Sequence, residues 1–393
     1  MYKSIKELDI YLSDGNYSSK YPRSEELVEE GIPFIRGNNM IDGEIVDEDM
    51  YHITEEKHNI LLKGHVQTGD VLITTRGNIG QVAIIPERHN DSNINAQIVL
   101  LRVNKDELYN RYLLWALQSH KSKEQYLTLQ TGTALKQLPV GKLEQVKIKY
   151  IDLQSQFQVA EILDKAYQVI KIRKRKLFAL DELIKARFVE LFGDPDTNPR
   201  GWDEVALSEK LDVIGGYAFK SDQFDEERGI PVLRIGNINA GFFRPINLVY
   251  WQEDENLERY AMYPGDLVMS LTGTVGKDDY GNVCILGNDY EMYYLNQRNA
   301  KLEIKEGIDK YYLSQLLKFE QIKKKLTGIS RGVRQANISN KDILNLVVPV
   351  PPMDLQNQYA DFTKQVDKSK VAVQKALDEA QLLFDSLMQK YFG

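Results

Sequence analysis

The sequence predicts an α+β protein in which two similar β-rich globular domains are separated by a pair of long antiparallel helices that form a coiled coil. Three observations predict this fold. The 393-residue chain carries the same ordered set of motifs twice. Each copy begins with short β-rich runs and ends with a long stretch that keeps a helical apolar stripe. The expected architecture is a dumbbell with pseudo-twofold symmetry, divided into residues 1–150, 151–194, 195–350 and 351–393.

The internal repeat appears as seven pairs of motifs in the same order, the members of each pair lying about 200 residues apart. Seven collinear matches favour a duplication over the chance similarity of common folds, and the period is too long for a solenoid. Each copy is therefore a domain-sized unit. The pairs are GIPFIRGNNMIDGEI with GIPVLRIGNINAGFF, QTGDVLITTRGNIG with YPGDLVMSLTGTVG, INAQIVLLRV with LNQRNAKLEI, RYLLWAL with YYLSQLL, TGTALKQL with RGVRQANI, IDLQSQ with MDLQNQ, and LIKARFVELFG with LFDSLMQKYFG.

The first part of each copy reads as a mixed α+β globule. In the first copy, residues 71–75, 82–86 and 98–103 are short runs of β-favouring residues bounded by Gly, Asn and Asp, which is typical of strands. Residues 112–126 instead show a helical patch near the end of the globule.

The second part of each copy reads as one long helix. No Gly or Pro falls between Ser155 and Phe192 or between Gln356 and Phe392, so each helix of about 36 residues would be roughly 54 Å long. The apolar stripe is narrow, advances in steps of four and three, and needs a partner helix. We expect the two helices to pair with each other; the alternative is that each folds back on its own globule. The stripe consists of Val159, Leu163, Ala166, Ile170, Leu177, Leu180 and Ile184, and of Phe362, Val366, Val373, Ala376, Ala380, Leu383 and Leu387.

Composition favours a cytoplasmic protein. The single cysteine, Cys284, allows no disulfide framework, and neither a signal peptide nor a membrane span is expected from the apolar runs. The formal net charge of −7 argues mildly against a nucleic-acid binder. A basic groove on an acidic body remains compatible with that charge, because binding depends on the local field.

Motifs for catalysis are not found. GTVGKDD (273–279) fails as a phosphate loop, because Leu271 stands where a Gly is needed and Asp278 where a Ser or Thr is needed. VPVPPMD (348–354) lacks the polar residue with which amino-methyltransferases hold the target amine. The five histidines do not show metal-ligand spacing. We therefore expect no catalysis, no metal site and no cofactor in this chain.

Polar side chains in matching loops are the candidate binding residues. Arg pairs with guanine and Asn or Gln with adenine, whereas Lys, Thr and Gly-rich backbone suit phosphates. Any one of them also fits an ordinary solvated loop, but the clusters favour DNA binding, and the two copies offer different side chains on one framework. The candidates are Arg36, Asn38, Asn39, Arg76, Asn78, Thr133, Lys136 and Gln137 in the first copy, and Tyr217, Lys220, Arg234, Asn237, Thr272, Thr274, Lys277, Arg331, Arg334, Gln335 and Asn337 in the second.

The basic run KIRKRK (171–176) lies in the middle of the first long helix. It reads either as the solvated face of the coiled coil or as a contact to the DNA backbone between two half-sites, and the first reading is slightly favoured.

The order of these motifs resembles the DNA specificity subunit of type I restriction–modification systems. The resemblance rests on GIPxxR, PGD or TGD, the TGT and SRG loops, the LQ phrase before each helix and ARFVELFGDP, and it covers essentially the whole chain. GGYAFKSDQF (215–224) resembles the usual start of such a recognition domain, whereas its counterpart SDGNYSSKYPRS (13–24) departs from it.

The resemblance implies more than the spacing does. Each target recognition domain would read one half of a split asymmetric double-stranded DNA site, and the helices would set the gap and dock two methyltransferase subunits. Those partners would hold S-adenosylmethionine and methylate adenine, while motor and endonuclease subunits would cut.

Two other readings stay open. One is a tandem binding protein for a protein or carbohydrate ligand, and the other is a stand-alone modification or restriction enzyme. The recognised bases and the gap length do not follow from the sequence, nor does the presence of a nuclease partner.

Overall fold

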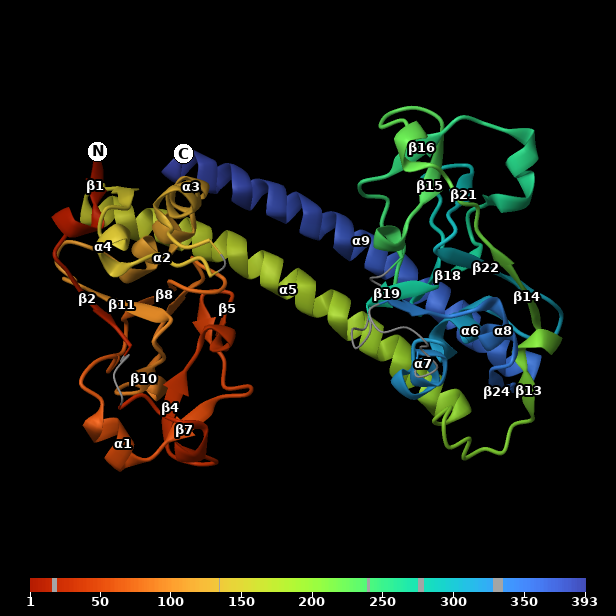
Figure 1. Cartoon of the computed structure of the whole chain (residues 1–393), viewed down its shortest axis with the longest axis horizontal. Coiled ribbons are helices and arrows are strands. Elements are labelled where there is room, and N and C mark those ends of the chain that lie inside the picture. Colours follow the sequence, from red (N-terminus) through yellow and green to blue (C-terminus); the bar gives the residue numbers. More distant parts are fainter. Residues whose placement is uncertain (16–19, 134, 239–240, 275–278, 328–334) are drawn as a thin grey trace. The chain divides into compact units, whose positions relative to one another are not determined.

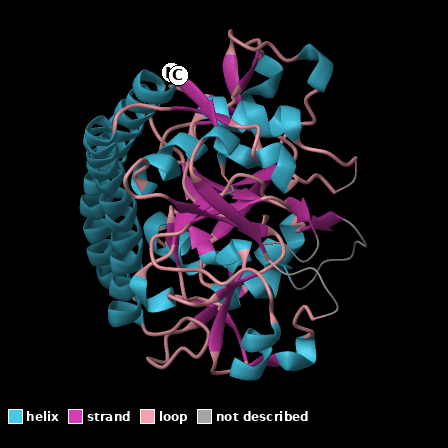
Figure 2. Ribbon diagram, turned by 90° about the vertical axis from the view of Figure 1, so that its left-hand side faces the viewer, coloured by secondary structure: helices cyan, strands magenta, loops and turns pink. Residues whose placement is uncertain are grey.

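The fold was analysed in a computed structural model that describes residues 1–15, 20–133, 135–238, 241–274, 279–327 and 335–393 (Figure 1). The chain divides into two compact units. The first unit contains residues 1–174 and 374–393, and the second contains residues 175–373. Both units mix strands, loops and helices, as the sequence predicts (Figure 2).

Each unit is built around a four-stranded sheet of the same order. In the first unit every neighbouring pair is antiparallel, and the same holds in the second unit. The predicted strands at 71–75, 82–86 and 98–103 are therefore confirmed. The sheets are β2 (Ile10–Asp14), β11 (Ile98–Val103), β8 (Val71–Thr74) and β9 (Val82–Ile84) in the first unit, and β14 (Leu211–Gly215), β22 (Asn299–Ile304), β18 (Leu267–Ser270) and β20 (Val283–Ile285) in the second.

A second four-stranded sheet, here called the distal sheet, completes each globule. Both distal sheets contain one parallel and one antiparallel pairing around the strand of the GIP motif, which is β4 in the first unit and β15 in the second. The distal sheets are β10 (Asn93–Ile94), β4 (Ile32–Ile35), β7 (Tyr51–Ile53) and β3 (Leu27–Val28) in the first unit, and β16 (Val249–Trp251), β15 (Ile230–Leu233), β21 (Tyr293–Leu295) and β17 (Ala261–Met262) in the second.

Short pairs of strands and short helices complete the two globules. The strand pairs are β1 (Tyr2–Ser4) with β12 (Lys147–Lys149), β5 (Met40–Ile41) with β6 (Glu44–Ile45), β13 (Glu204–Ala206) with β24 (Val347–Pro349), and β19 (Thr272–Thr274) with β23 (Gln335–Asn337). The helices are α1 (Glu55–Ile60), α2 (Asn110–Gln118), α3 (His120–Leu129), α4 (Val140–Leu143), α6 (Lys310–Leu316), α7 (Glu320–Thr327) and α8 (Asn340–Leu344).

Two helices of 40 residues each, α5 (Leu153–Phe192) and α9 (Met353–Phe392), contribute to both units. Each is about 60 Å long at 1.5 Å per residue. Within the second unit they run antiparallel, because Asp181 pairs with Lys370 at 2.6 Å whereas Arg187, further along α5, lies over the ring of Phe362, further back on α9. The predicted antiparallel pairing is therefore present in this unit.

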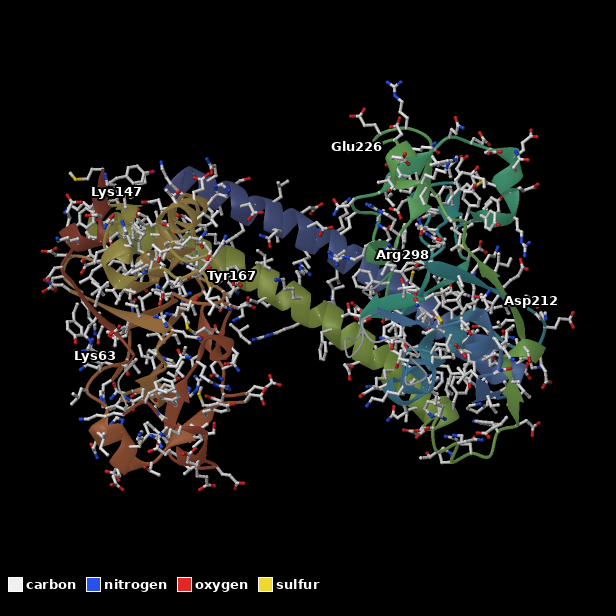
Figure 3. All side chains as sticks on the ribbon, in the orientation of Figure 1. Lys63, Lys147, Tyr167, Asp212, Glu226 and Arg298 are labelled. Atoms are coloured by element: carbon white, nitrogen blue, oxygen red, sulfur yellow. The ribbon has the colours of Figure 1, made fainter. Side chains whose placement is uncertain are left out.

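In the first unit the two helices meet around an aromatic cluster. Tyr167 of α5 and Phe384 of α9 both contact Trp115 of α2, with ring centroids 5.3 Å apart in each case. Asp164 of α5 accepts a hydrogen bond from the Trp115 indole at 2.8 Å and a two-pronged ion pair from Arg111. Figure 3 labels Tyr167 on α5. These contacts join α2 and both long helices in one core.

The predicted apolar stripe is largely confirmed, with one correction. Val159, Leu163, Ile170, Ile184, Val366 and Val373 are buried. Leu383, however, is 57% exposed, and its neighbour Phe384 occupies the core instead. A step of four from Ala380 reaches Phe384, so the prediction chose the wrong one of two adjacent apolar residues.

The alignment of IDLQSQ with MDLQNQ is wrong by two residues. Gln156 and Gln356 are the equivalent side chains, because each is fully buried and accepts a backbone N–H across the core, from Tyr109 at 2.8 Å and from Asp309 at 2.7 Å. The match by letters instead places Gln356 on the exposed Gln154. The helical register thus follows burial, not the repeated phrase.

The basic run at 171–176 is mostly exposed, but Lys171 is not. Its ammonium pairs with Glu44 at 2.8 Å, and the residue is 8% exposed. Lys171 therefore joins α5 to β6.

Among the described residues, no helix is long and apolar enough to cross a membrane.

Candidate nucleic-acid interface

The turn after the GIP strand has the same side-chain structure in both units. Asn39 in the first unit and Asn237 in the second are buried, at 0% and 2% exposure. Each accepts the backbone N–H of the Arg three residues earlier, at 3.1 and 2.9 Å. Each also donates through its amide to two carbonyls of the next strand-like segment. Both amides are therefore consumed inside the turn.

The Arg of the GIPxxR motif completes this turn. Arg36 donates to the carbonyl of Asp49, and Arg234 donates to the carbonyl of Asn247. Both acceptor residues have left-handed backbones, with φ of 53° and 50°. Arg36 also lies 3.3 Å from the ring centroid of Tyr51. We name this arrangement the Arg–Asn clip, defined by Arg36 and Asn39 and by Arg234 and Asn237.

The clip determines how far four predicted site residues are exposed. Asn39 and Asn237 lie in the core, so neither amide is presented for base recognition. Arg36 is half-buried, and Arg234 is exposed although its guanidinium is bound to the loop. Asn38, which lies inside the same turn, is exposed. The sequence could not separate Asn38 from Asn39, because both are polar residues of one loop.

In the first unit three loops converge at one end of the sheet formed by β2, β11, β8 and β9. The Thr75 N–H donates to the Gln97 carbonyl at 2.7 Å, and the Leu138 N–H donates to the Thr75 carbonyl at 2.8 Å. Arg76 and Gln137 form a β-bridge. The side chains of Arg76 and Gln97 are exposed at this junction.

The second unit repeats the convergence with different side chains. The Leu271 N–H donates to the Arg298 carbonyl and the Ile338 N–H to the Leu271 carbonyl, both at 2.8 Å. Thr272 pairs with Asn337 in the β19–β23 ladder, which takes the place of the Arg76–Gln137 bridge. The motif alignment places Arg76 on Thr272 and Gln137 on Asn337, and the two pairings confirm it. Figure 3 labels Arg298 close to the ribbon of β19.

We call these two regions the reading surfaces. The first consists of Arg76, Gln97 and residues 131–137 as far as they are described; the second consists of Thr272, Thr274, Arg298 and Asn337. Asn78, Thr133 and Lys136 are exposed on the loops of the first surface, and Thr274 and Asn337 on those of the second. The Thr274 N–H is held by Asp279 at 2.7 Å.

A fourth segment packs against each reading surface and requires glycine. A Cβ on Gly15 would lie 2.2 Å from the Asn95 carbonyl oxygen, and a Cβ on Gly216 would lie 2.1 Å from the Asn296 carbonyl oxygen. The chain after Gly216 then places Tyr217 next to the second surface, because its N–H donates to the Leu295 carbonyl and its carbonyl accepts the Gln297 N–H, both at 2.8 Å.

Tyr217 is 38% exposed, and its ring packs against Phe219 and Tyr260. It offers an aromatic face that is already held in place. Lys220 follows as an exposed residue at the start of a 3₁₀ turn.

Four predicted site residues receive no structural test. Lys277, Arg331 and Arg334 lie outside the described residues, and only the backbone of Gln335 is described, opposite Thr274.

Gln97 and Arg298 were not among the predicted binding residues, although the sequence offered a signal for their exposed position. They occupy the same place in the repeated motif and differ in chemistry. Each lies in a turn where an Asn, Asn95 or Asn296, accepts the N–H of the exposed residue. Position in a repeat with a changed side chain was therefore the informative pattern.

The fold and the two reading surfaces define a duplicated recognition protein. The same framework occurs in both units and exposes a different set of polar side chains at the same place. Comparisons with known proteins agree. The profile of the type I restriction modification DNA specificity domain matches residues 10–182 and again residues 199–380. The chain belongs to this family and is a type I restriction–modification specificity subunit with two DNA specificity domains.

Two relatives come from Methanocaldococcus jannaschii. The specificity subunit of the type I restriction enzyme MjaVIII is 26% identical over 355 residues, which cover 82% of this chain and 77% of that protein. The putative MjaX specificity subunit is 24% identical, with coverage of 88% and 84%. The fold is also that of the crystallised type I restriction–modification S subunit of M. genitalium, at 16% identity, a TM-score of 0.60, and coverage of 100% and 96%.

Proposed function

We propose that each unit reads one half of a split, asymmetric site in double-stranded DNA, and that the two halves differ in sequence. The observation that carries this proposal is the pair of reading surfaces. Backbone hydrogen bonds hold the loops in the same way in both units, whereas Arg76 and Gln97 in the first are replaced by Thr272 and Arg298 in the second.

The chemistry of these side chains suits base and phosphate contacts. An Arg guanidinium matches the O6 and N7 acceptors of guanine, and a Gln amide matches adenine in the major groove. Thr133, Lys136 and Thr274 suit phosphate oxygens, which position a protein without reading sequence. A net charge of −7 does not oppose this arrangement, since only the local field at the loops acts on the DNA.

Catalysis is proposed to reside in partner subunits in the cytoplasm. Two methyltransferase subunits would bind S-adenosylmethionine and methylate adenine, and motor and endonuclease subunits would complete a restriction complex. One face of α5 supports a protein contact: Phe157 and Val169 are 47% and 42% exposed and border a shallow hollow of about 630 Å³ with Tyr109. We propose that a methyltransferase subunit covers this face.

The long helices are proposed to set the gap between the half-sites. Each contributes residues to both units, α5 up to residue 174 in the first and from 175 in the second. The length of α5 and α9 would then fix how many base pairs go unread.

The test is a pair of single substitutions in the complex assembled with its methyltransferase subunits. Arg76→Ala should relax the base preference in one half-site, and Arg298→Ala should relax it in the other, each by the roughly 5- to 150-fold that about 1–3 kcal/mol of base discrimination represents. Mapping methylated adenines in a plasmid library would identify the half that changes.

Matched controls are Lys105→Ala and Lys305→Ala. These exposed lysines follow β11 and β22 at the ends opposite to the turns that hold Gln97 and Arg298. Both controls should leave the half-sites unchanged. If Arg76→Ala and Arg298→Ala altered the same half-site, or neither altered any, the assignment of one reader to each unit would be wrong.

The rival functions give different results in the same preparation. Phosphate contacts make the affinity for DNA fall steeply as the salt concentration rises. A protein or carbohydrate binder would show no such DNA affinity. A stand-alone enzyme would methylate or cleave DNA as the purified chain alone.

A further inference from the structure

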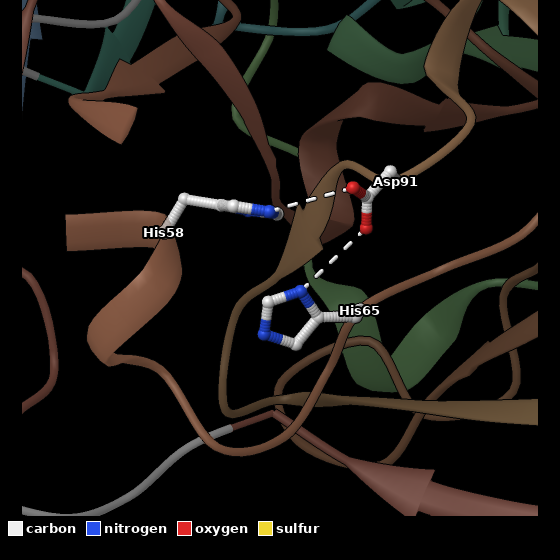
Figure 4. A group of neighbouring side chains, drawn as sticks. All are labelled: His58, His65 and Asp91. Atoms are coloured by element: carbon white, nitrogen blue, oxygen red, sulfur yellow. Dashed lines mark ion pairs between the residues drawn. The ribbon is translucent and has the colours of Figure 1, made fainter. Parts of the chain in front are cut away.

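Two histidines and an aspartate that are distant in sequence meet beside the distal sheet of the first unit (Figure 4). His58 lies on α1, His65 on the segment that follows, and Asp91 just before β10. The His58 Nε2 is 3.5 Å from one Asp91 oxygen, and the His65 Nδ1 is 3.7 Å from the other. One donor atom from each residue lies within 4.8 Å of the other two.

Each imidazole is oriented by a hydrogen bond through its other nitrogen. The His65 Nε2 lies 2.8 Å from the Leu61 carbonyl oxygen, which only accepts, so Nε2 carries the proton. The His58 Nδ1 donates to the Asn93 side-chain oxygen at 2.6 Å. In the neutral rings, the lone pairs of Nδ1 of His65 and Nε2 of His58 then face the Asp91 carboxylate. This pattern, with the outer N–H held by an oxygen, is the one that prepares histidine for a metal.

Three lone pairs that converge without a positive charge between them repel one another. The two rings meet edge to face with their centroids 4.6 Å apart, so both imidazoles approach the Asp91 carboxylate from neighbouring directions. A single divalent cation would satisfy all three groups at once. We propose that His58, His65 and Asp91 bind one Zn²⁺ ion, which joins α1 to the edge of the distal sheet.

The distances suit zinc. Bonds of about 2.0–2.1 Å in a tetrahedron place neighbouring ligand atoms about 3.3–3.4 Å apart. The two histidine nitrogens lie 3.5 and 3.7 Å from different oxygens of Asp91, and one donor atom from each residue lies within 4.8 Å of the other two, so side-chain rotations would bring the three atoms to a common ion. Two imidazole nitrogens and a carboxylate oxygen are ligands that zinc accepts, and a water molecule would complete the site. The Asp91 side chain is 68% exposed, so it has room to turn toward the ion.

The backbone holds two of the ligands on paired segments. The Asp91 N–H donates to the Val66 carbonyl at 2.8 Å, and the Val66 N–H donates to the Ser92 carbonyl at 3.0 Å. Asp91 adopts a left-handed backbone with φ of 62°, which an aspartate tolerates. His65 and Asp91 are thereby fixed as neighbours before any ion binds.

The second unit has different residues at the corresponding pairing. His65 faces Asn93 in the first unit, and Ala261 faces Tyr294 in the second. Tyr294 is buried in an apolar cluster there with Phe219, Val232 and Leu257. Of these two corresponding places, the histidine cluster is present in the first unit and absent from the second. The shared framework therefore does not require it.

The experiment is a zinc titration of the full chain after removal of metals with a chelator. Calorimetry should show about one Zn²⁺ per chain, and Co²⁺ should give the visible absorption of a tetrahedral site. His65→Gln and Asp91→Asn should each weaken Zn²⁺ binding about tenfold or more, since even outer partners of a ligand contribute 10- to 100-fold. Zinc should raise the melting temperature of the unmodified chain by more than that of His65→Gln at the same zinc concentration.

The matched control is His120→Gln, which removes an exposed histidine that pairs with Glu124 in its own helix turn. It should bind zinc like the unmodified chain, and circular dichroism should show that all variants are folded. Failure of the unmodified chain to bind stoichiometric zinc, or binding that His65→Gln leaves unchanged, would overturn the proposal. These readouts involve no DNA, so they are independent of the proposed function.

Discussion

Asn38 and Asn39 are adjacent, have the same side chain and do different things. Asn39 satisfies three backbone groups in the Arg–Asn clip, whereas Asn38 is exposed. The clip at Asn237 repeats the arrangement in the second unit. A polar residue that recurs at one place in a duplicated chain is thus a sign of a structural role, and a polar residue that changes there is the better candidate for recognition.

We expect Asn39→Ala to lower the free energy of unfolding of the first unit by about 1–3 kcal/mol, because it leaves buried backbone groups unpaired. Asn38→Ala should change it by less than about 0.5 kcal/mol, as exposed substitutions do. Differential scanning calorimetry of the two variants measures the difference. Equal effects would show that Asn39 does not stabilise the turn.

Cys284 should not react in the folded protein. It lies in β20, it is 1% exposed, and burial raises the pKa of its thiol to about 12. Because the thiolate is the reactive form, the folded chain at pH 8 has almost none of it, whereas the unfolded chain begins to ionise near its ordinary pKa of 9. Mass spectrometry after incubation with a maleimide should show labelling only in denaturant. Rapid labelling under native conditions would contradict the burial of this strand.

At the scale of elements, each long helix begins in the same way. Gln156 and Gln356 bridge the first turn of α5 and α9 to the loop before α2 and α6, through a backbone N–H on one side and carbonyls on the other. The helix is thereby fixed to its own globule at the point where it leaves it.

Both segments contain an exposed glutamine two residues away, which provides matched controls. We expect Gln156→Ala and Gln356→Ala each to lower the melting temperature by several degrees, since about 1–3 kcal/mol is lost with a buried partner. Gln154→Ala and Gln358→Ala should melt like the unmodified chain. If Gln154→Ala destabilised as much as Gln156→Ala, the alignment by letters would be the correct one.

The elements were predictable to within a few residues where the signal was local. Strand runs at 71–75, 82–86 and 98–103 and the absence of Gly and Pro in the helices required no long-range contact. Choices between neighbours were not predictable: Leu383 and Phe384 are equally apolar, and only the packing on Trp115 selects the second. The histidine cluster was missed for the same reason, because residues 58, 65 and 91 meet only through the pairing of their segments.

At the scale of the whole molecule, the duplicated plan followed from the order of the motifs, and the family match to residues 10–182 and 199–380 confirms it. The reading surfaces were predictable only in part. The loops were found, but which side chains they expose depends on the packing. Asn39 was predicted as a binding residue and is buried, whereas Gln97 was not predicted and is exposed.

The proposed role of the helices gives a prediction for the assembled complex. Insertion of four residues, about one helical turn, after residue 174 of α5 and after residue 373 of α9 should lengthen the unread gap and preserve both half-sites. Methylation mapping of the variant complex measures both properties. Changed half-sites with an unchanged gap would show that the helices do not set the spacing.

The core of the first unit includes Phe384 and Phe392, which pack on Trp115 and Tyr112. On the ribosome, about 200 residues of the second unit are made between Lys174 and Gln374, which takes on the order of ten to forty seconds at roughly 5–20 residues per second. During that interval Trp115 and Tyr112 of the nascent first unit lack Phe384 and Phe392 as packing partners. The half of the protein that is translated first is therefore the half that finishes folding last.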